Sequence, residues 1–249
     1  MANNLEFLFI TWNVNPEIFR IGGFALRYYS VMFAIAFILG YLIVKRMYQK
    51  EGLDLELLNP LLIYIIVGTL VGARLGQVFF YEFGYFKHHL LEIILPFRIS
   101  NKGFEWTGYQ GLASHGGAIG ILMAIALYCK KYKENFLRVM DKLVVAVALA
   151  GFFIRTGNLF NSEIIGKPTN DSWAFIFERI DLLPRHPSQV YEAFAYLFTF
   201  FVLYALYERK GIELKRGLLF GLFLVLVFTA RFLLSLQKKT RKHSKVHCQ

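Results

Sequence analysis

Long apolar segments alternate with shorter polar segments along most of the chain. An α-helix needs about 20 residues to cross the hydrocarbon core of a bilayer. Apolar runs near that length occupy residues 28–44, 55–81, 112–129, 143–160, 190–207 and 218–234. This pattern predicts an all-α polytopic membrane protein with about six transmembrane helices.

The composition agrees with a membrane protein. Hydrophobic residues make up 56% of the 249 residues and charged residues only 18%. A water-soluble domain is usually less apolar than this. The net charge of +11 has three candidate explanations, which are nucleic acid, anionic lipid and membrane topology.

The positions of the basic residues favour topology. Basic clusters follow the first, third and fifth apolar segments, and cytoplasmic loops carry such an excess of Lys and Arg. We therefore expect these three loops to be cytoplasmic, and the N-terminus and the loops 82–111 and 161–189 to lie outside. Most of the excess charge is then explained without nucleic acid. The clusters are Lys45, Arg46 and Lys50; Lys130, Lys131, Lys133 and Arg138; and Arg209, Lys210, Lys215 and Arg216.

The last segment does not fit this scheme. Residues 235–249 are strongly basic, yet six spans from an outside start leave them outside as well. A short basic tail that tolerates either side is one interpretation, and a missing final helix is the other. We expect one polytopic domain over residues 1–249, with an interfacial N-terminal segment (1–26), a transmembrane body (27–234) and an atypical tail (235–249).

Polar residues inside the apolar segments carry the functional information, because ionisable groups at membrane depth are costly. With alternating helix directions, every span contributes such residues at the level of the outer leaflet. This convergence predicts one site there. The residues are Arg27, Tyr28, Tyr29, Arg74, His115, Arg155, Asn158, Glu192 and Arg231.

Several of these residues also have a purely structural interpretation. Arg74 is in a position to extend to the lipid headgroups. His115, in the sequence Ser-His-Gly-Gly, is compatible with a hydrogen-bonded helix start whose glycines permit close packing. Glu192 is a candidate for an ion pair with an arginine, the commonest fate of a buried carboxylate.

The residue types limit the chemistry of the site. Arginines bind phosphate bidentately, and a histidine without a Ser-His-Asp set suits proton transfer. The sequence has no Gly-rich nucleotide loop, no cluster of metal-binding carboxylates and no aromatic-rich basic groove for nucleic acid. The residues alone therefore indicate an enzyme or a binder that acts on an anionic lipid in the outer leaflet.

Five motifs together resemble the prolipoprotein diacylglyceryl transferase family. The match runs in family order over about residues 7–234, and the fourth motif followed by the fifth is specific for this bacterial family. The motifs are Leu26-Arg27-Tyr28-Tyr29; Ala73-Arg74-Leu75-Gly76; Ser114-His115-Gly116-Gly117; Arg155-x-Gly157-Asn158-x-x-Asn161-x-Glu163-x-x-Gly166; and Arg185-His186-Pro187-Ser188-Gln189-x-Tyr191-Glu192.

The resemblance implies a reaction at the outer face of the bacterial cytoplasmic (inner) membrane. The diacylglyceryl group of phosphatidylglycerol moves to the lipobox cysteine thiol of a preprolipoprotein, and glycerol 1-phosphate leaves. No metal and no organic cofactor is implied. By resemblance, Arg155 grips the lipid phosphate, His115 takes the thiol proton, Arg231 lies near the same phosphate, and Tyr29 donates a hydrogen bond.

The resemblance also assigns a set of residues to substrate binding or to support of the pocket. Asn158, Asn161, Glu163 and Gly166 shape the pocket wall, and Glu192 and Arg74 support it by ion pairing. The full set is Arg155, Asn158, Asn161, Glu163, Gly166, Gly116, Gly117, Arg74 and Glu192.

The chain departs from the family pattern at its end. The family has seven spans and a glutamate four residues after the arginine that matches Arg231, where this chain has Ser235. A truncated or frameshifted chain is one interpretation of this end, and a divergent natural terminus is the other. The alternative function is an inactive or truncated family member that acts only as an anionic-lipid-binding membrane protein. A transporter predicts inverted repeats and polar breaks near the midplane, which the sequence does not show. A non-catalytic lipid-binding subunit predicts the arginines without the histidine and the tyrosine.

Overall fold

A computed structural model describes most of the chain, namely residues 9–22, 24–87, 89, 91–94, 97–100, 103–106 and 113–235. The chain folds into two compact units. The first unit combines Met1–Met47 with Met140–Gln249, and the second is Tyr48–Val139.

Each of the six predicted apolar segments forms a long helix. The helices are α1 (Tyr28–Lys50), α2 (Leu58–Phe80, after the 3-10 turn Leu55–Leu57), α5 (Ser114–Tyr132), α6 (Phe136–Phe160), α7 (Ser188–Lys210, continued by the 3-10 turn Gly211–Glu213) and α8 (Leu218–Ser235). Four of the described helical segments are long and apolar enough to cross a membrane, and these contain α1, α2, α7 and α8. The polytopic membrane fold is thereby confirmed, and the count of six spans stays a prediction.

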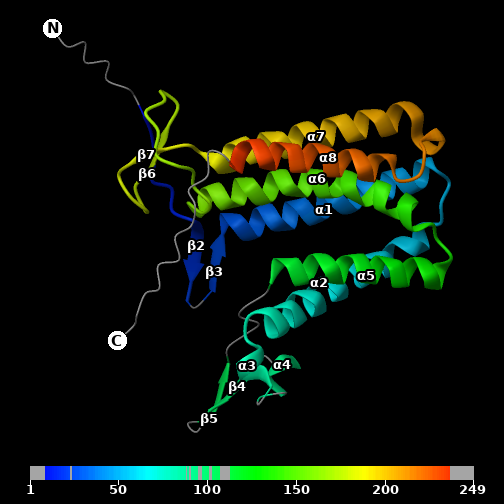
Figure 1. The fold of residues 1–249 in the computed structure, drawn as a ribbon, viewed down its shortest axis with the longest axis horizontal. Helices are drawn as coiled ribbons and strands as arrows, with labels where there is room; N and C mark the ends of the chain where they lie inside the picture. The colour runs from blue at the N-terminus through cyan, green and yellow to red at the C-terminus, as the bar shows by residue number, and fades with distance from the viewer. Residues whose placement is uncertain are drawn as a thin grey trace. The chain divides into compact units, whose positions relative to one another are not determined.

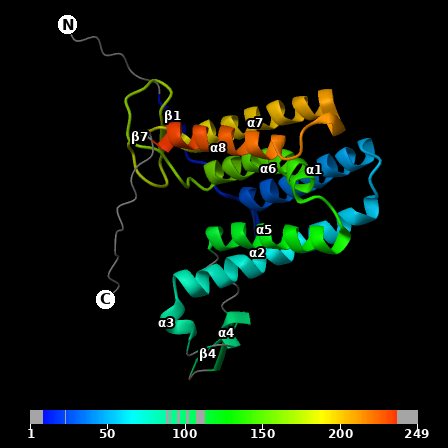
Figure 2. The ribbon, with the colours of Figure 1, turned by 45° about the vertical axis from the view of Figure 1, so that its right-hand side comes forward.

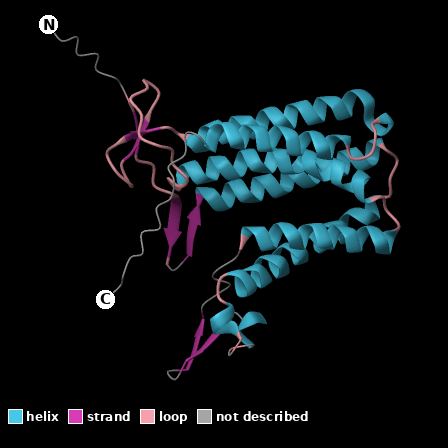
Figure 3. Cartoon of the chain, in the orientation of Figure 1, coloured by secondary structure: helices cyan, strands magenta, loops and turns pink. Residues whose placement is uncertain are grey.

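In the first unit, α1, α6, α7 and α8 lie side by side (Figure 1; Figure 2). Short strands that the sequence did not predict lie at one end of these helices (Figure 3). Strand β1 (Ile10–Trp12) pairs in parallel with β6 (Phe175–Phe177), which pairs antiparallel with β7 (Pro184–Arg185). The N-terminal segment and the loop between α6 and α7 therefore share one end of the unit.

A hairpin of β2 (Glu17–Ile21) and β3 (Phe24–Arg27) leads into α1. Glu17 accepts a hydrogen bond from Arg20 Nη2 at 2.6 Å, and Arg27 lies 3.6 Å away. The hydrogen bond from Arg20 is the main cause that lowers the pKa of Glu17 below its ordinary value. The hairpin thus carries a local charge cluster next to the start of α1.

The other end of the first unit is fixed by hydrogen bonds between helices. Tyr207 of α7 donates to the Met47 carbonyl of α1 at 3.1 Å. The Asp141 carboxylate of α6 accepts from the backbone N–H of Gly217 at 2.6 Å and of Phe220 at 2.8 Å. Because the first N–H groups of a helix have no partner inside it, Asp141 caps α8 and joins it to α6.

The second unit is built around a close crossing of α2 and α5 (Figure 2). A Cβ on Gly72 would lie 2.4 Å from the Gly116 carbonyl oxygen, and a Cβ on Gly120 would lie 2.1 Å from the Gly68 carbonyl oxygen. Only glycine permits this approach of two backbones, as in small-residue interfaces of membrane helices. The expected close packing at the start of α5 is therefore confirmed for Gly116.

The described residues of the loop between α2 and α5 form four short elements. They are α3 (Phe83–Phe86), α4 (Leu91–Ile94) and an antiparallel pair of β4 (Phe97–Ser100) with β5 (Gly103–Trp106). The predicted loop 82–111 includes several residues that lie outside the described ones.

Candidate functional site

The centre of the candidate site is a buried ion pair between α6 and α7. Arg155 lies near the C-terminal end of α6, and its Nε is 2.6 Å from Oε2 of Glu192, in the second turn of α7. The Arg155 side chain is 14% exposed and that of Glu192 only 2%. At this burial each charge needs the other, because a lone charge would be strongly disfavoured.

Amide side chains continue from Arg155 to the exit of α6. Arg155 Nη1 donates to Asn158 Oδ1 at 3.2 Å, and Asn158 Nδ2 donates to Glu163 Oε2 at 3.1 Å. The other carboxylate oxygen of Glu163 accepts from Asn161 Nδ2, also at 3.1 Å. Three predicted site residues thus form one hydrogen-bonded chain with Arg155, in which the Asn158 amide uses both its ends.

The turn that carries Glu163 has an unusual backbone. Ser162 has φ 54° and Ile164 has φ 59°, so both neighbours of Glu163 are in the left-handed region. This conformation is rare for a β-branched residue and costs roughly 1–3 kcal/mol for each non-glycine residue. The surrounding structure must therefore hold this turn in place.

Gly166 lies where two backbone segments meet. Its N–H donates to the His186 carbonyl at 2.9 Å. A Cβ on Gly166 would come within 2.6 Å of that oxygen and within 2.7 Å of Ser188 Oγ. The position has no room for a side chain, which is the physical reason for a glycine there.

Tyr29 packs against α6 at Gly157. A Cβ on Gly157 would lie 2.8 Å from Cδ2 and 3.3 Å from Cα of Tyr29. The neighbouring Tyr28 ring stacks on Phe160 with a centroid distance of 4.4 Å and an interplanar angle of 11°. The first turn of α1 therefore packs against the last turns of α6. The role of Tyr29 as a hydrogen-bond donor to the substrate stays a prediction.

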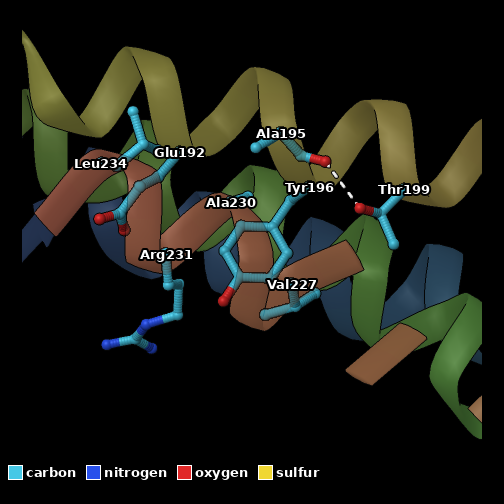
Figure 4. A pocket seen from close by; sticks show the side chains of 8 residues that line it. All are labelled: Glu192, Ala195, Tyr196, Thr199, Val227, Ala230, Arg231 and Leu234. Atoms are coloured by element: carbon cyan, nitrogen blue, oxygen red, sulfur yellow. Dashed lines mark hydrogen bonds between the residues drawn. The ribbon is translucent and has the colours of Figure 1, made fainter. Parts of the chain in front are cut away.

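Arg231 lines a small, open pocket between α7 and α8. Figure 4 shows the Arg231 guanidinium, the Glu192 carboxylate and the Tyr196 hydroxyl directed toward the same side of the two helices. Glu192 therefore belongs both to the ion pair with Arg155 and to the pocket wall that contains Arg231. The lining residues are Glu192, Ala195, Tyr196, Thr199, Val227, Ala230, Arg231 and Leu234.

His115 and its glycines belong to the second unit. His115 is exposed in the first turn of α5, while Gly116 and Gly117 are buried. A Cβ on Gly117 would lie 3.5 Å from Ala73 Cβ, an ordinary contact. That His115 and Arg155 act on the same lipid stays a prediction.

Arg74, also in the second unit, binds the short helix α4. Its Nε donates to the Ile93 carbonyl at 3.0 Å, and its Nη2 donates to the Glu92 carbonyl at 2.5 Å. Its guanidinium carbon lies 4.9 Å from the centre of the Phe86 ring. Arg74 thus fastens α4 to α2 through these two hydrogen bonds, and we call this role a clamp. The sequence pattern alone did not indicate it.

Gln189 is a further residue of the site whose role the sequence left open. It is 1% exposed, and its Nε2 donates to the Glu163 carbonyl oxygen. The sequence placed Gln189 in a motif, one helical turn before Glu192, but a contact between residues 26 positions apart has no local signal.

Among the described residues, no group of three or more His, Cys, Asp or Glu side chains is placed to hold a metal ion.

Comparisons with known proteins identify the family. A family model described as prolipoprotein diacylglyceryl transferase matches residues 16–246. A phosphatidylglycerol–prolipoprotein diacylglyceryl transferase of Bacteroides fragilis is 45% identical over 240 residues, which cover 96% of this chain and 86% of the relative. Relatives of the same name from Tolumonas auensis (47% identity, 90% of this chain and 82% of the relative) and Chloroherpeton thalassium (44%, 92% and 82%) agree. The chain therefore belongs to the prolipoprotein diacylglyceryl transferase family.

Proposed function

We propose that this chain transfers the diacylglyceryl group of phosphatidylglycerol to the lipobox cysteine thiol of preprolipoproteins and releases glycerol 1-phosphate. The observation that carries the proposal is the buried Arg155–Glu192 pair with its chain of amides, on a helix end beside a lined pocket. The names of the relatives give the reaction class.

The geometry of Arg155 suits a phosphate ligand. A guanidinium has five N–H donors. Nε lies 2.6 Å from Oε2 of Glu192 in an ion pair and Nη1 donates to Asn158, while Nη2 makes no hydrogen bond or ion pair within the described residues. The remaining N–H groups are thus available for two phosphate oxygens, while Glu192 fixes the plane of the guanidinium.

The proposed step is a substitution at the carbon of the diacylglyceryl group that carries the phosphate. A sulfur–carbon bond forms as the cysteine thiolate attacks, and the carbon–oxygen bond to the phosphate breaks. Negative charge grows on the departing glycerol phosphate, where Arg155 and Arg231 stabilise it. The thiol proton goes to His115, because the thiolate is the reactive form of cysteine.

Tyr29 donates a hydrogen bond to the substrate, and Gly116 and Gly117 belong to the substrate-binding residues at the start of α5. Asn158, Asn161, Glu163 and Gly166 form the pocket wall. The reaction needs no metal and no organic cofactor, and nucleic acid is not a partner.

The proposed location is the bacterial cytoplasmic membrane with the site toward the outer leaflet, in a single polytopic domain. Basic residues after the first, third and fifth apolar segments support cytoplasmic ends there. The pairing of β1 with β6 supports a common side for the N-terminal segment and the loop between α6 and α7.

The test is transfer by the purified full chain in mixed micelles that contain phosphatidylglycerol and a synthetic lipobox peptide. We expect the mass of the peptide to rise by one diacylglyceryl group, with release of glycerol phosphate. A peptide with serine in place of the cysteine, and micelles of phosphatidylcholine alone, are the controls. Binding of phosphatidylglycerol without any transfer would favour the alternative, an inactive lipid-binding member.

The role of His115 is tested in the same assay. We expect His115→Ala to lower the transfer rate by roughly a hundredfold at neutral pH, and less at alkaline pH, where the thiol loses its proton without help. Full activity of His115→Ala between about pH 6 and 8 would remove His115 as the base.

A further inference from the structure

Gln189 and Glu192 both reach from α7 to the exit of α6. They lie three positions apart, so their side chains leave the same face of the helix. Gln189 Nε2 donates to the Glu163 carbonyl oxygen, while Glu192 pairs with Arg155. Helix α7 therefore contacts the C-terminal end of α6 in two places. Gln189 binds the backbone of the turn that follows α6, and Glu192 binds the side chain of Arg155 in α6.

The hydrogen bond from Gln189 to the backbone lies in the strained turn of residues 162–164. The Glu163 carbonyl belongs to the residue between Ser162 at φ 54° and Ile164 at φ 59°. Both neighbours relax to ordinary backbone angles unless the turn is held. The hydrogen bond from Gln189, which is 1% exposed, is a buried contact aimed at this turn.

The conformation of this turn also sets the direction of the Glu163 carboxylate. Glu163 is exposed, so water competes for its carboxylate oxygens. While the turn is held, both oxygens accept from amide groups, of Asn158 and of Asn161. The bond to Asn158 fixes which end of that amide faces Arg155, so that its oxygen accepts from Nη1.

We propose that Gln189 is a positioning residue: through the strained Ser162–Ile164 turn and the Asn158 amide, it fixes the orientation of the Arg155 guanidinium. The inference rests on the proposed function only where it concerns the effect on transfer. The structural part, that Gln189 holds the turn, is independent of the reaction.

The experiment compares Gln189→Met with the wild-type full chain in detergent micelles. Methionine keeps nearly the shape of glutamine but has no N–H donor. Hydrogen–deuterium exchange of the segment 158–166 reports the turn, and kcat and KM for phosphatidylglycerol report transfer. Gln77→Met, in α2 and outside this network, is the matched control.

We expect exchange in segment 158–166 to rise about tenfold in Gln189→Met and kcat to fall about tenfold, with a smaller change in KM. In an Ile164→Gly background the loss of kcat caused by Gln189→Met should shrink to about threefold or less, because glycine adopts a positive φ without strain. Gln77→Met should change neither measurement.

Three results would overturn the inference. One is exchange of segment 158–166 in Gln189→Met equal to that of the wild type. Another is an equal loss of kcat with and without Ile164→Gly. The third is a uniform rise of exchange over all helices, which indicates general destabilisation. A wild-type chain without transfer would instead refute the proposed function, and the exchange measurement would still decide the role of Gln189.

Discussion

Arg155 and Glu192 form an ion pair with Nε 2.6 Å from Oε2, between the end of α6 and the beginning of α7. The pair is almost fully buried, so its value lies less in net stability than in the orientation it imposes. Glu192 lies against Nε and Asn158 accepts from Nη1, so the guanidinium is held in a fixed plane. This relationship leads to the first prediction.

Replacement of Arg155 by Lys keeps the charge but removes the planar set of donors. We expect the transfer rate to fall by roughly a hundredfold, because one ammonium cannot bind Glu192, Asn158 and a phosphate in fixed directions. The measurement is the rate of peptide lipidation together with thermal unfolding in detergent.

The matched control is Arg46→Lys. Arg46 also pairs with a glutamate, Glu208, but at 3.6 Å and with 66% of its side chain exposed. Such a pair contributes little, so the rate should stay within about twofold of the wild type. A rate near that of the wild type in Arg155→Lys would contradict the phosphate role.

Gly157→Ala tests the contact between α6 and α1. The new Cβ would meet Tyr29 at 2.8 Å on the ring and 3.3 Å on the backbone Cα, so the helices must shift or the ring must turn. We expect a loss of roughly 1–3 kcal/mol in the free energy of unfolding and a clear loss of transfer. Gly221→Ala in α8, where a Cβ meets nothing within 4 Å, is the control. Normal transfer activity of Gly157→Ala would show that the position of Tyr29 against α6 does not matter for the reaction.

The sequence predicted the helices well, because each long apolar segment reports its own length and composition. All six correspond to helices, from α1 to α8. The strands escaped prediction for the opposite reason. The pairing of Ile10 with Phe175 joins residues far apart in the chain, and three-residue strands have no periodic pattern of their own.

The site was predictable only where one segment carried it. Arg155, Asn158, Asn161 and Glu163 lie within nine residues, and the structure connects them by hydrogen bonds. Their partner Gln189 comes from another helix, and the positive φ of Ile164 opposes the preference of that residue. Such conflicts between local preference and tertiary structure are expected at functional sites.

Gly120→Ala tests the crossing of α2 and α5. The new Cβ would lie 2.1 Å from the Gly68 carbonyl oxygen, and a backbone atom cannot rotate away as a side chain does. The helices must separate, so we expect a loss of several °C in the midpoint of thermal unfolding. In the control Gly40→Ala the Cβ lies 3.5 Å from Ala146 Cβ, an ordinary contact. Equal unfolding of the two variants would contradict the close crossing.

Arg74→Lys distinguishes a clamp from an arginine that only extends to the headgroups. Arg74 donates from Nε to Ile93 and from Nη2 to Glu92, and it lies over the Phe86 ring. A lysine has a single ammonium and cannot keep both carbonyl bonds and the stacked contact. We therefore expect α4 to loosen from α2.

Limited trypsin digestion measures this loosening at Lys87, the exposed residue that follows α3. Cleavage after Lys87 should become about fivefold faster in Arg74→Lys, because proteolysis follows the population of the opened segment. The exposed Arg179, in the first unit, provides the control Arg179→Lys, which should leave cleavage at Lys87 unchanged. If Arg74→Lys also leaves it unchanged, a point charge suffices at this position, and extension of the side chain to the lipid headgroups is the better explanation of Arg74.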